Sequence, residues 1–423
     1  MRWIKFAIAT PVLIAVVLLS GCDINDYFSP EKLVPPPPGG RSEAWMFNGS
    51  WFELVYNSLN DLIGAFEFSD SHTFQPLNPF DPLVQTLIDA REKTIISHTL
   101  HPNAEQASGR QASSNSHAIV YLLAADGTLA QFDPANKTIV NTTKRLLCTD
   151  PPPANIAVAT NEFDVTPDGS LAFIAARDSV SNCVIVFDLA NWRIANRIPL
   201  PSGANDIIPG EIKITPDGTT AYLVGTNNQH GALPTGVLFI IATATHKLTS
   251  TIQLPQNFNT NEIAMSPDGL YAYLGSSTGG QSKIPVLDTT TNTIGSYIPV
   301  ATLDGTGMAV HPDGTRLYLV PFLKYGPITI VDTSTYQARG TIPSQAGSPS
   351  DPASPQPGYP DPVFTPDGRY MFVLNAPNAV TAVDTLTEQV VSHAPIPPPP
   401  SGPGIPLNPQ EYITTFYVPN LAN

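Results

Sequence analysis

Short apolar segments recur along the chain, and each one is bounded by Gly, Pro, Asp or Asn. Examples are Ala221-Tyr-Leu-Val224 and Phe372-Val-Leu-Asn375. Segments this short between turn residues predict β-strands rather than helices. The chain of 423 residues also contains 45 Pro and 29 Gly, which predicts many turns and few long helices. The pattern therefore indicates an all-β protein.

One turn motif, Pro-Asp-Gly, repeats with a strand before it and a strand after it. Pro presets φ at the first corner, the Asp side chain accepts hydrogen bonds within the turn, and Gly adopts a positive φ. We therefore interpret the five Asp residues as structural turn residues. They are Asp168, Asp217, Asp268, Asp313 and Asp367.

A second motif follows the third strand of each repeat and reads apolar-x-apolar-apolar-Asp-x-x-Thr. Its clearest copies are Ile328–Thr335 and Val380–Thr387. We expect its Asp to form an Asx-type turn between the third and fourth strands. The copies lie at Asp89, Asp133, Asp188, Asp288, Asp332 and Asp384, with Ala242 as a substituted copy.

Seven copies of this corner, with four short strands in each repeat, predict a seven-bladed β-propeller, six or eight blades being the alternatives. The first repeat, residues 83–99, lacks an inner strand, whereas an unmatched strand remains at 412–420. We therefore expect a propeller over 83–423, closed by the strand within 411–420, which pairs beside residues 83–89.

The repeat resembles a known family. Pro-Asp-Gly, then a strand such as Tyr222-Leu-Val-Gly225, then Val-x-Val-Asp-x-x-Thr is similar to the YVTN-type β-propeller repeat. Tyr417-Val-Pro-Asn420 differs from the hallmark at one residue, and the resemblance covers roughly 83–420. It implies the fold but no single activity, because such repeats occur in surface-layer proteins, binding modules and enzymes.

The N-terminus reads as an export signal. Arg2 and Lys5 precede the apolar run Phe6–Leu19, which is short for a membrane span. Leu19-Ser-Gly-Cys22 resembles the bacterial lipobox, which implies removal of 1–21 and acylation of Cys22; a short transmembrane anchor is the alternative. Asp23 resembles an inner-membrane retention signal.

Two segments separate this anchor from the ring. Residues 22–44, with four consecutive prolines at 35–38, predict an extended tether. Residues 45–82 are interpreted as a helical or irregular capping segment. Its helix is predicted at about 51–65, because Ser50-Trp-Phe-Glu53 forms a capping box before apolar residues at helical spacing.

The net charge limits the kinds of partner that the protein can bind. The net charge is −15 and no Lys/Arg cluster occurs, which argues against nucleic acid. The partners expected are the membrane, through the lipid, and an envelope protein or glycan.

Cys148 and Cys183 lie toward one face on neighbouring repeats, so a disulfide is expected, two separate buried thiols being the alternative.

The sequence shows no pattern that predicts catalytic residues, a cofactor or a metal site. Gly275-Ser-Ser-Thr-Gly279 is interpreted as a turn between two strands and not as a nucleophile elbow, which requires a strand entering a helix. His98 and His101 are interpreted as lying in a solvated loop. Inner strands such as Ile212-Lys-Ile214 read as largely apolar.

These observations favour a membrane-tethered module of the cell envelope that binds a protein or glycan and is not catalytic. Its binding surface is expected on the long connections 97–116, 146–160, 344–360 and 394–410. The alternative is an enzyme of the lactonase-like or quinoprotein-like propeller type, with a site at the central tunnel.

Overall fold

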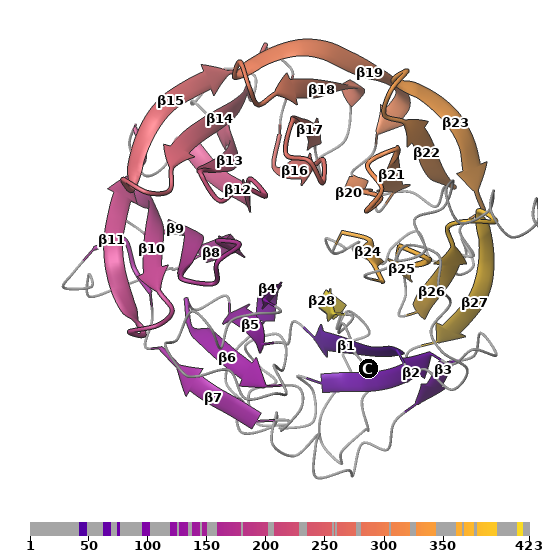
Figure 1. The fold of residues 1–423 in the computed structure, drawn as a ribbon, viewed down its shortest axis with the longest axis horizontal. Coiled ribbons are helices and arrows are strands. Elements are labelled where there is room, and N and C mark those ends of the chain that lie inside the picture. Colours follow the sequence, from indigo (N-terminus) through magenta and orange to yellow (C-terminus); the bar gives the residue numbers. More distant parts are fainter. Residues whose placement is uncertain are drawn as a thin grey trace, which may run out of the picture.

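The computed structural model describes residues 42–48, 62–68, 74–76, 95–101 and 413–417 and, with short internal gaps, 119–149, 159–343 and 361–395. These residues form seven four-stranded antiparallel sheets, arranged around a central axis (Figure 1). In the described part of the chain no helix is long and apolar enough to cross a membrane. The protein is an all-β seven-bladed propeller.

The sheets, each given from its innermost strand outward, follow the chain around the ring. The first holds β28 (Ile413–Tyr417), β1 (Ser42–Asn48), β2 (Leu62–Phe68) and β3 (Phe74–Pro76). The second holds β4 (Ile95–His101), β5 (Ile119–Ala124), β6 (Leu129–Asp133) and β7 (Thr138–Thr142). The third holds β8 (Ala159–Val165), β9 (Leu171–Arg177), β10 (Asn182–Asp188) and β11 (Arg193–Pro199).

The remaining four sheets have the same order. They are β12 (Ile207–Ile214), β13 (Thr220–Asn227), β14 (Thr235–Ala242) and β15 (Lys247–Gln253); β16 (Glu262–Met265), β17 (Tyr271–Gly275), β18 (Gln281–Asp288) and β19 (Thr293–Leu303); β20 (Thr306–Val310), β21 (Arg316–Pro321), β22 (Ile328–Asp332) and β23 (Gln337–Ile342); and β24 (Val363–Phe364), β25 (Tyr370–Asn375), β26 (Ala379–Asp384) and β27 (Gln389–Pro395).

The core lies between sheets, because the middle strands whose burial the structure describes bury both of their faces. In β13, Leu223 packs with Phe173 of the preceding sheet, whereas its neighbour Tyr222 packs with Ile263 and Leu274 of the following sheet. Alternation along a strand thus sends successive side chains to opposite neighbours. A strand that contacts a sheet on each side reads as continuously apolar, as the sequence does here.

The Pro-Asp-Gly turns have the predicted chemistry. In the turn at 216–218, Asp217 Oδ1 accepts from Thr215 Oγ1 at 2.6 Å and from the Thr219 N–H at 3.0 Å, and Gly218 has a φ of 73°. Asp168, Asp268 and Asp313 accept similar bonds within their own turns. Asp367 lies outside the described residues.

The Asp-x-x-Thr corners are Asx-type turns. Asp332 Oδ1 accepts from the Ser334 and Thr335 N–H groups, each at 2.9 Å, and Asp188, Asp288 and Asp384 accept in the same way. The residue four positions after each of these Asp residues has a positive φ, and so does His246 after the substituted Ala242. Asp89 and the side chain of Asp133 lie outside the described residues.

The ring is closed by the C-terminal strand, but its partner differs from the predicted one. β28 pairs with β1, so that Trp45 is the register partner of Tyr417 and Phe47 that of Thr415. The expected partner, 83–89, was wrong because the chain enters the ring earlier, at Ser42. The propeller therefore begins within the segments that the sequence suggested were tether and cap.

The predicted helix is also wrong where the structure describes it. Residues 62–65, its last turn, belong to strand β2, and residues 51–61 lie outside the described part. Pairing of β2 with β1 on one side and β3 on the other overrides the local helical spacing. Likewise the first repeat, predicted at 83–99 without an inner strand, contributes residues 95–99 to β4, which is the innermost strand of the second sheet.

Candidate functional site

One position of the repeat is acidic in four of the five sequences that precede a Pro-Asp-Gly turn. It lies five residues before the Pro and holds Glu162, Glu211, Glu262 and Asp361, with Gly307 in the remaining repeat. The three glutamates lie on the innermost strands β8, β12 and β16, and Asp361 lies two residues before β24. Because innermost strands surround the axis, the repeat brings these carboxylates toward one another.

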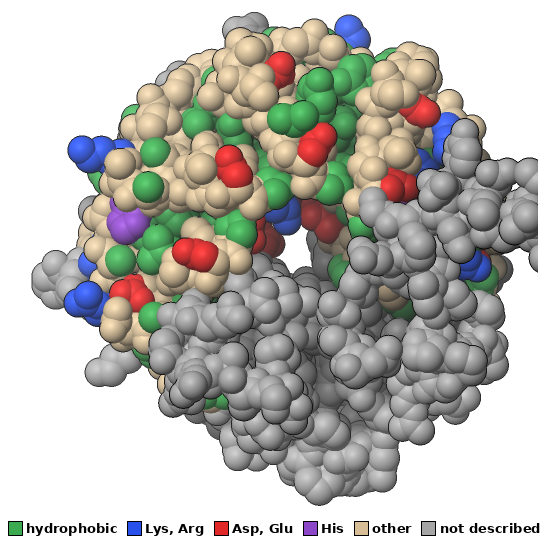
Figure 2. Space-filling model, in the orientation of Figure 1, with side chains coloured by type: hydrophobic (Ala, Val, Ile, Leu, Met, Phe, Trp, Pro, Cys, Tyr) green, Lys and Arg blue, Asp and Glu red, His purple; other side chains and the backbone are tan. Residues whose placement is uncertain are grey.

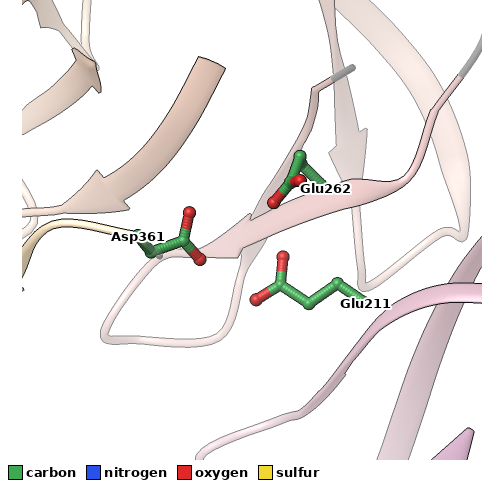
Figure 3. A group of neighbouring side chains, drawn as sticks. All are labelled: Glu211, Glu262 and Asp361. Atoms are coloured by element: carbon green, nitrogen blue, oxygen red, sulfur yellow. The ribbon is translucent and has the colours of Figure 1, made fainter. Parts of the chain in front are cut away.

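Three of these carboxylates converge at the central channel. Oxygen atoms of Glu211, Glu262 and Asp361 all lie within 4.8 Å of one another, although the residues come from three different sheets (Figure 3). The space-filling view shows a central opening with acidic and basic side chains on its wall (Figure 2). The amino group of Lys213, two residues along β12, forms an ion pair with Glu211 Oε1.

The carboxylates also connect the innermost strands of neighbouring sheets. The N–H of Ile263 on β16 donates to Glu211 Oε2 on β12 at 2.7 Å, and the N–H of Ile214 on β12 donates to Asp164 Oδ2 on β8 at 2.7 Å. The Met308 N–H on β20 donates to Asp361 Oδ1 at 2.8 Å. These bonds hold each carboxylate at a defined place on the channel wall.

The shared location of the charges changes their protonation. Burial raises the pKa of Asp361 well above its ordinary value, and the carboxylate of Glu211 raises it further. Burial likewise raises the pKa of Glu262, with added repulsion from Asp361 and Glu211. The site thus holds more negative charge than its surroundings stabilise, so protonation is favoured.

Lys213 titrates in the sense expected for a cation held by carboxylates. Burial lowers the pKa of its amino group, but Glu211, Asp361 and Asp164 outweigh this effect, and the pKa lies above its ordinary value. Asp164, whose pKa burial raises, is stabilised in its charged form by the same Lys213. The electrostatics of the channel therefore favour positive charge.

The donor set suits a hard cation. Ca²⁺ binds carboxylate oxygens at about 2.3–2.6 Å, so opposite ligand atoms around one ion lie up to about 5 Å apart. The 4.8 Å limit on the oxygens of Glu211, Glu262 and Asp361 is compatible with that spacing. The arrangement can also provide a protonated carboxyl group beside an ionised one, which is the basis of general acid–base chemistry.

This cluster corrects the prediction that the inner strands are largely apolar. The inner strands were read from Ile212 and Ile263, one residue too late, so Glu211 and Glu262 were left out. Asp361 was missed because it precedes its short strand. Aligning all repeats on Pro-Asp-Gly would have shown the acidic position.

The structure places the other candidate residues on strands or in turns, or they lie outside the described part. His98 and His101 lie on β4 rather than in a loop, and Gly275 ends β17, which pairs with the strand β18 and not with a helix. His311 replaces the Ser or Thr of other turns, and its Nε2 contacts the Gly368 carbonyl of the next sheet at 2.9 Å. Cys22 lies outside the described residues.

Cys148 and Cys183 are joined by a disulfide, with their Cα atoms 5.6 Å apart. Cys148 follows the last strand of the second sheet and Cys183 lies on β10 of the third, so the bond links two neighbouring sheets. Near it, Asp178 Oδ2 accepts from the Thr149 N–H at 3.2 Å, and the Leu147 carbonyl accepts from Arg197 Nε at 2.8 Å. The link and these bonds hold residues 147–149 against the third sheet.

The comparisons with known proteins agree with the fold. No family model matches the chain. A stretch of 145 residues is 30% identical to the seven-bladed beta-propeller protein Rv1057 of Mycobacterium tuberculosis, covering 33% of this chain and 32% of that protein. The match thus spans about a third of the relative's length.

Among solved structures, the hydrazine synthase of Kuenenia stuttgartiensis superposes with a TM-score of 0.53 at 15% identity. The superposition covers 71% of this chain and 86% of that one. At this identity the similarity concerns the fold alone. Both comparisons therefore support the propeller fold, and the proposed function rests on the channel.

Proposed function

We propose that the protein is a lipid-anchored, non-catalytic binding module of the bacterial cell envelope, and that its central channel binds a divalent cation. The observation that carries this proposal is the convergence of Glu211, Glu262 and Asp361 from three sheets. The export signal and the lipobox-like Leu19–Cys22 support the location. The partner is an envelope protein or glycan that supplies or retains the cation.

Lys213 gives a second reason to expect a cationic ligand, because a positively charged group already lies among the carboxylates. Its amino group already lies against Glu211, and its side chain is 36% exposed, so it reaches the solvent of the channel. A bound divalent ion would compete with this internal cation and with the protons on Glu262 and Asp361. Binding should therefore release protons and strengthen as the pH rises.

The test is calorimetric titration of the folded protein with CaCl₂, MgCl₂ and MnCl₂ in two buffers of different ionisation enthalpy. We expect saturable binding of at least one ion, with a buffer-dependent heat that reports proton release. Glu262→Gln and Asp361→Asn should weaken binding at least tenfold, whereas Asp217→Asn, which removes an exposed turn carboxylate, should not. Absence of binding by all three ions would contradict the proposal.

A second candidate function is hydrolysis at the same channel, as in propeller enzymes of the lactonase-like type. It is favoured by the raised pKa of Asp361 beside the carboxylate of Glu211, a pairing of acid and base. A panel of lactones, assayed with and without divalent ions, tests it. Turnover that Asp361→Asn abolishes would support catalysis over binding alone.

A further inference from the structure

The Pro-Asp-Gly turns lie next to one another on one face of the propeller, along an arc from the third to the seventh sheet. A Cβ atom added to Gly269 would lie 2.7 Å from Cδ of Pro216, and one added to Gly218 would lie 3.1 Å from Cδ of Pro167. Gly314 and Gly368 approach Pro267 and Pro312 in the same way. We call this surface the turn face; the Asp-x-x-Thr corners share it, because connections alternate between faces in an antiparallel sheet.

Strand β1 begins at the turn face. In the sheets that contain Pro-Asp-Gly, the second strand starts directly after the turn, as β13 does at Thr220 after 216–218. β1 occupies this second position, since it lies between β28 and β2. Its first residue, Ser42, pairs with Phe68, the last residue of the third strand β2, which also ends at that face.

We propose that the turn face is directed toward the membrane and that the opposite face is presented to partners. The inference rests on the lipid anchor of the proposed function. Cys22 lies 20 residues before Ser42, and 20 residues span at most about 70 Å of fully extended chain. Such a tether holds the face from which it leaves nearest to the lipid.

The charge of the turn face does not reverse this orientation. Hydrogen bonds from Ser334 and Thr335 lower the pKa of Asp332 to about 2, and similar bonds lower the pKa of Asp217 and Asp268, so these turn carboxylates are ionised at neutral pH. Anionic lipid repels such a surface, but the screening length is about 8 Å at physiological ionic strength. The repulsion therefore separates the ring from the surface without turning it over.

The orientation determines how a ligand reaches the carboxylates. Glu211 and Glu262 lie five residues before the Pro of their turns, which is about 16 Å of extended strand away from the turn face. They are therefore displaced toward the outward opening of the channel. The divalent cation of the proposed function would then enter the channel from the partner side.

The test uses the full-length lipidated protein on vesicles of phosphatidylethanolamine and phosphatidylglycerol that contain a lipid with a quencher on its headgroup. Leu270→Cys and Ile208→Cys each add one free thiol for a fluorophore. Leu270 follows the turn at 267–269 and is 45% exposed; Ile208 lies at the far end of β12 and is 39% exposed. We expect at least twofold stronger quenching at position 270.

Two results separate the inference from the proposed function. Equal quenching, or stronger quenching at 208, in vesicle-bound protein would overturn the orientation and leave the anchor intact. Failure of the protein to bind vesicles, or binding that Cys22→Ser does not abolish, would overturn the lipid anchor and the orientation with it. Cation titration of the unlabelled protein measures the channel site separately.

Discussion

The backbone N–H of Ile263 donates to Oε2 of Glu211 at 2.7 Å, across the boundary between two sheets of the ring. The same carboxylate holds the amino group of Lys213 through its other oxygen. Glu211 therefore has two functions: it joins innermost strands β12 and β16, and it holds the positive charge that stabilises the carboxylates around it.

Glu211→Gln should destabilise the protein. Gln keeps an acceptor for the Ile263 N–H but loses the charge that faces Lys213. Breaking a fully buried ion pair costs about 3–5 kcal/mol, and the Lys213 side chain is 36% exposed, so we expect a smaller loss, on the order of 2 kcal/mol. Urea denaturation measures it.

Glu262→Gln is the matched control for that prediction. Burial and the neighbouring carboxylates raise the pKa of Glu262, so its negative charge is unfavourable in the folded protein. Replacing it with neutral Gln should leave the free energy of unfolding unchanged or increase it. Equal losses in the two variants would show that Glu211 contributes no specific stabilisation.

The channel carboxylates should lower stability as the pH rises. The pKa values of Glu262 and Asp361 are raised above their ordinary 4.5 and 3.8, so the folded state holds more protons than the unfolded state. The contribution of these protonated groups to the free energy of unfolding is complete below pH about 4 and decreases as the pH rises toward the folded-state pKa. Asp361→Asn should therefore gain stability relative to wild type between pH 4 and 8 in urea denaturation.

Asp332→Asn should change the pH dependence of stability in the opposite direction. Hydrogen bonds from Ser334 and Thr335 lower the pKa of Asp332 to about 2, so its carboxylate stabilises the fold above the ordinary pKa and loses that effect as the pH falls through about 2. The cost of Asp332→Asn should be constant at neutral pH and smaller in acid. Parallel pH profiles for the two variants would contradict both assignments.

How far the sequence predicted the fold depended on the turns. Where Pro-Asp-Gly and Asp-x-x-Thr both occur, strands and turns were predicted correctly, because each motif has a local geometric cause. The first sheet lacks Pro-Asp-Gly, and its strand β1 pairs with β2 on one side and on the other with β28, more than 300 residues away. The sequence does carry Asp70-Ser-His-Thr73 between β2 and β3, a copy of the corner motif that was overlooked.

The site was less predictable than the fold because it depends on which residue of each inner strand faces the axis. Ile212 and Ile263 pack between sheets, and the residues directly before them, Glu211 and Glu262, face the channel. The prediction of apolar inner strands is correct for the two isoleucines, but it overlooks the two glutamates. The distances among three sheets follow only from closure of the ring.

Restoring the Asp of the corner motif at Ala242 should stabilise the protein. His246, four residues later, has a φ of 52°, close to the 54° of Asn292 after Asp288, so the backbone already has the turn geometry. Ala242→Asp should accept the N–H groups two and three residues later and raise the free energy of unfolding by about 0.5–1 kcal/mol. Asp288→Ala should lose about as much; a destabilised Ala242→Asp would refute the shared geometry.

The disulfide should contribute substantially to stability. It closes a segment with a sequence separation of 35 between Cys148 and Cys183, for which the loss of unfolded-chain entropy corresponds to about 4 kcal/mol. The double variant Cys148→Ser/Cys183→Ser should show a lower Tm in calorimetry, and dithiothreitol should lower the Tm of the wild type but not of this variant. A Tm that neither change affects would mean that the surrounding bonds hold the loop alone.

Deletion of residues 411–423 should unfold the ring. It removes β28, the innermost strand of the first sheet, and leaves β1 without its inner partner. Each sheet buries its faces against its neighbours, so an incomplete first sheet exposes apolar surface on both sides of the gap. We expect loss of the cooperative thermal transition in circular dichroism. Deletion of 418–423 alone leaves β28 whole and should preserve the transition; unchanged unfolding after the longer deletion would show that closure does not depend on β28.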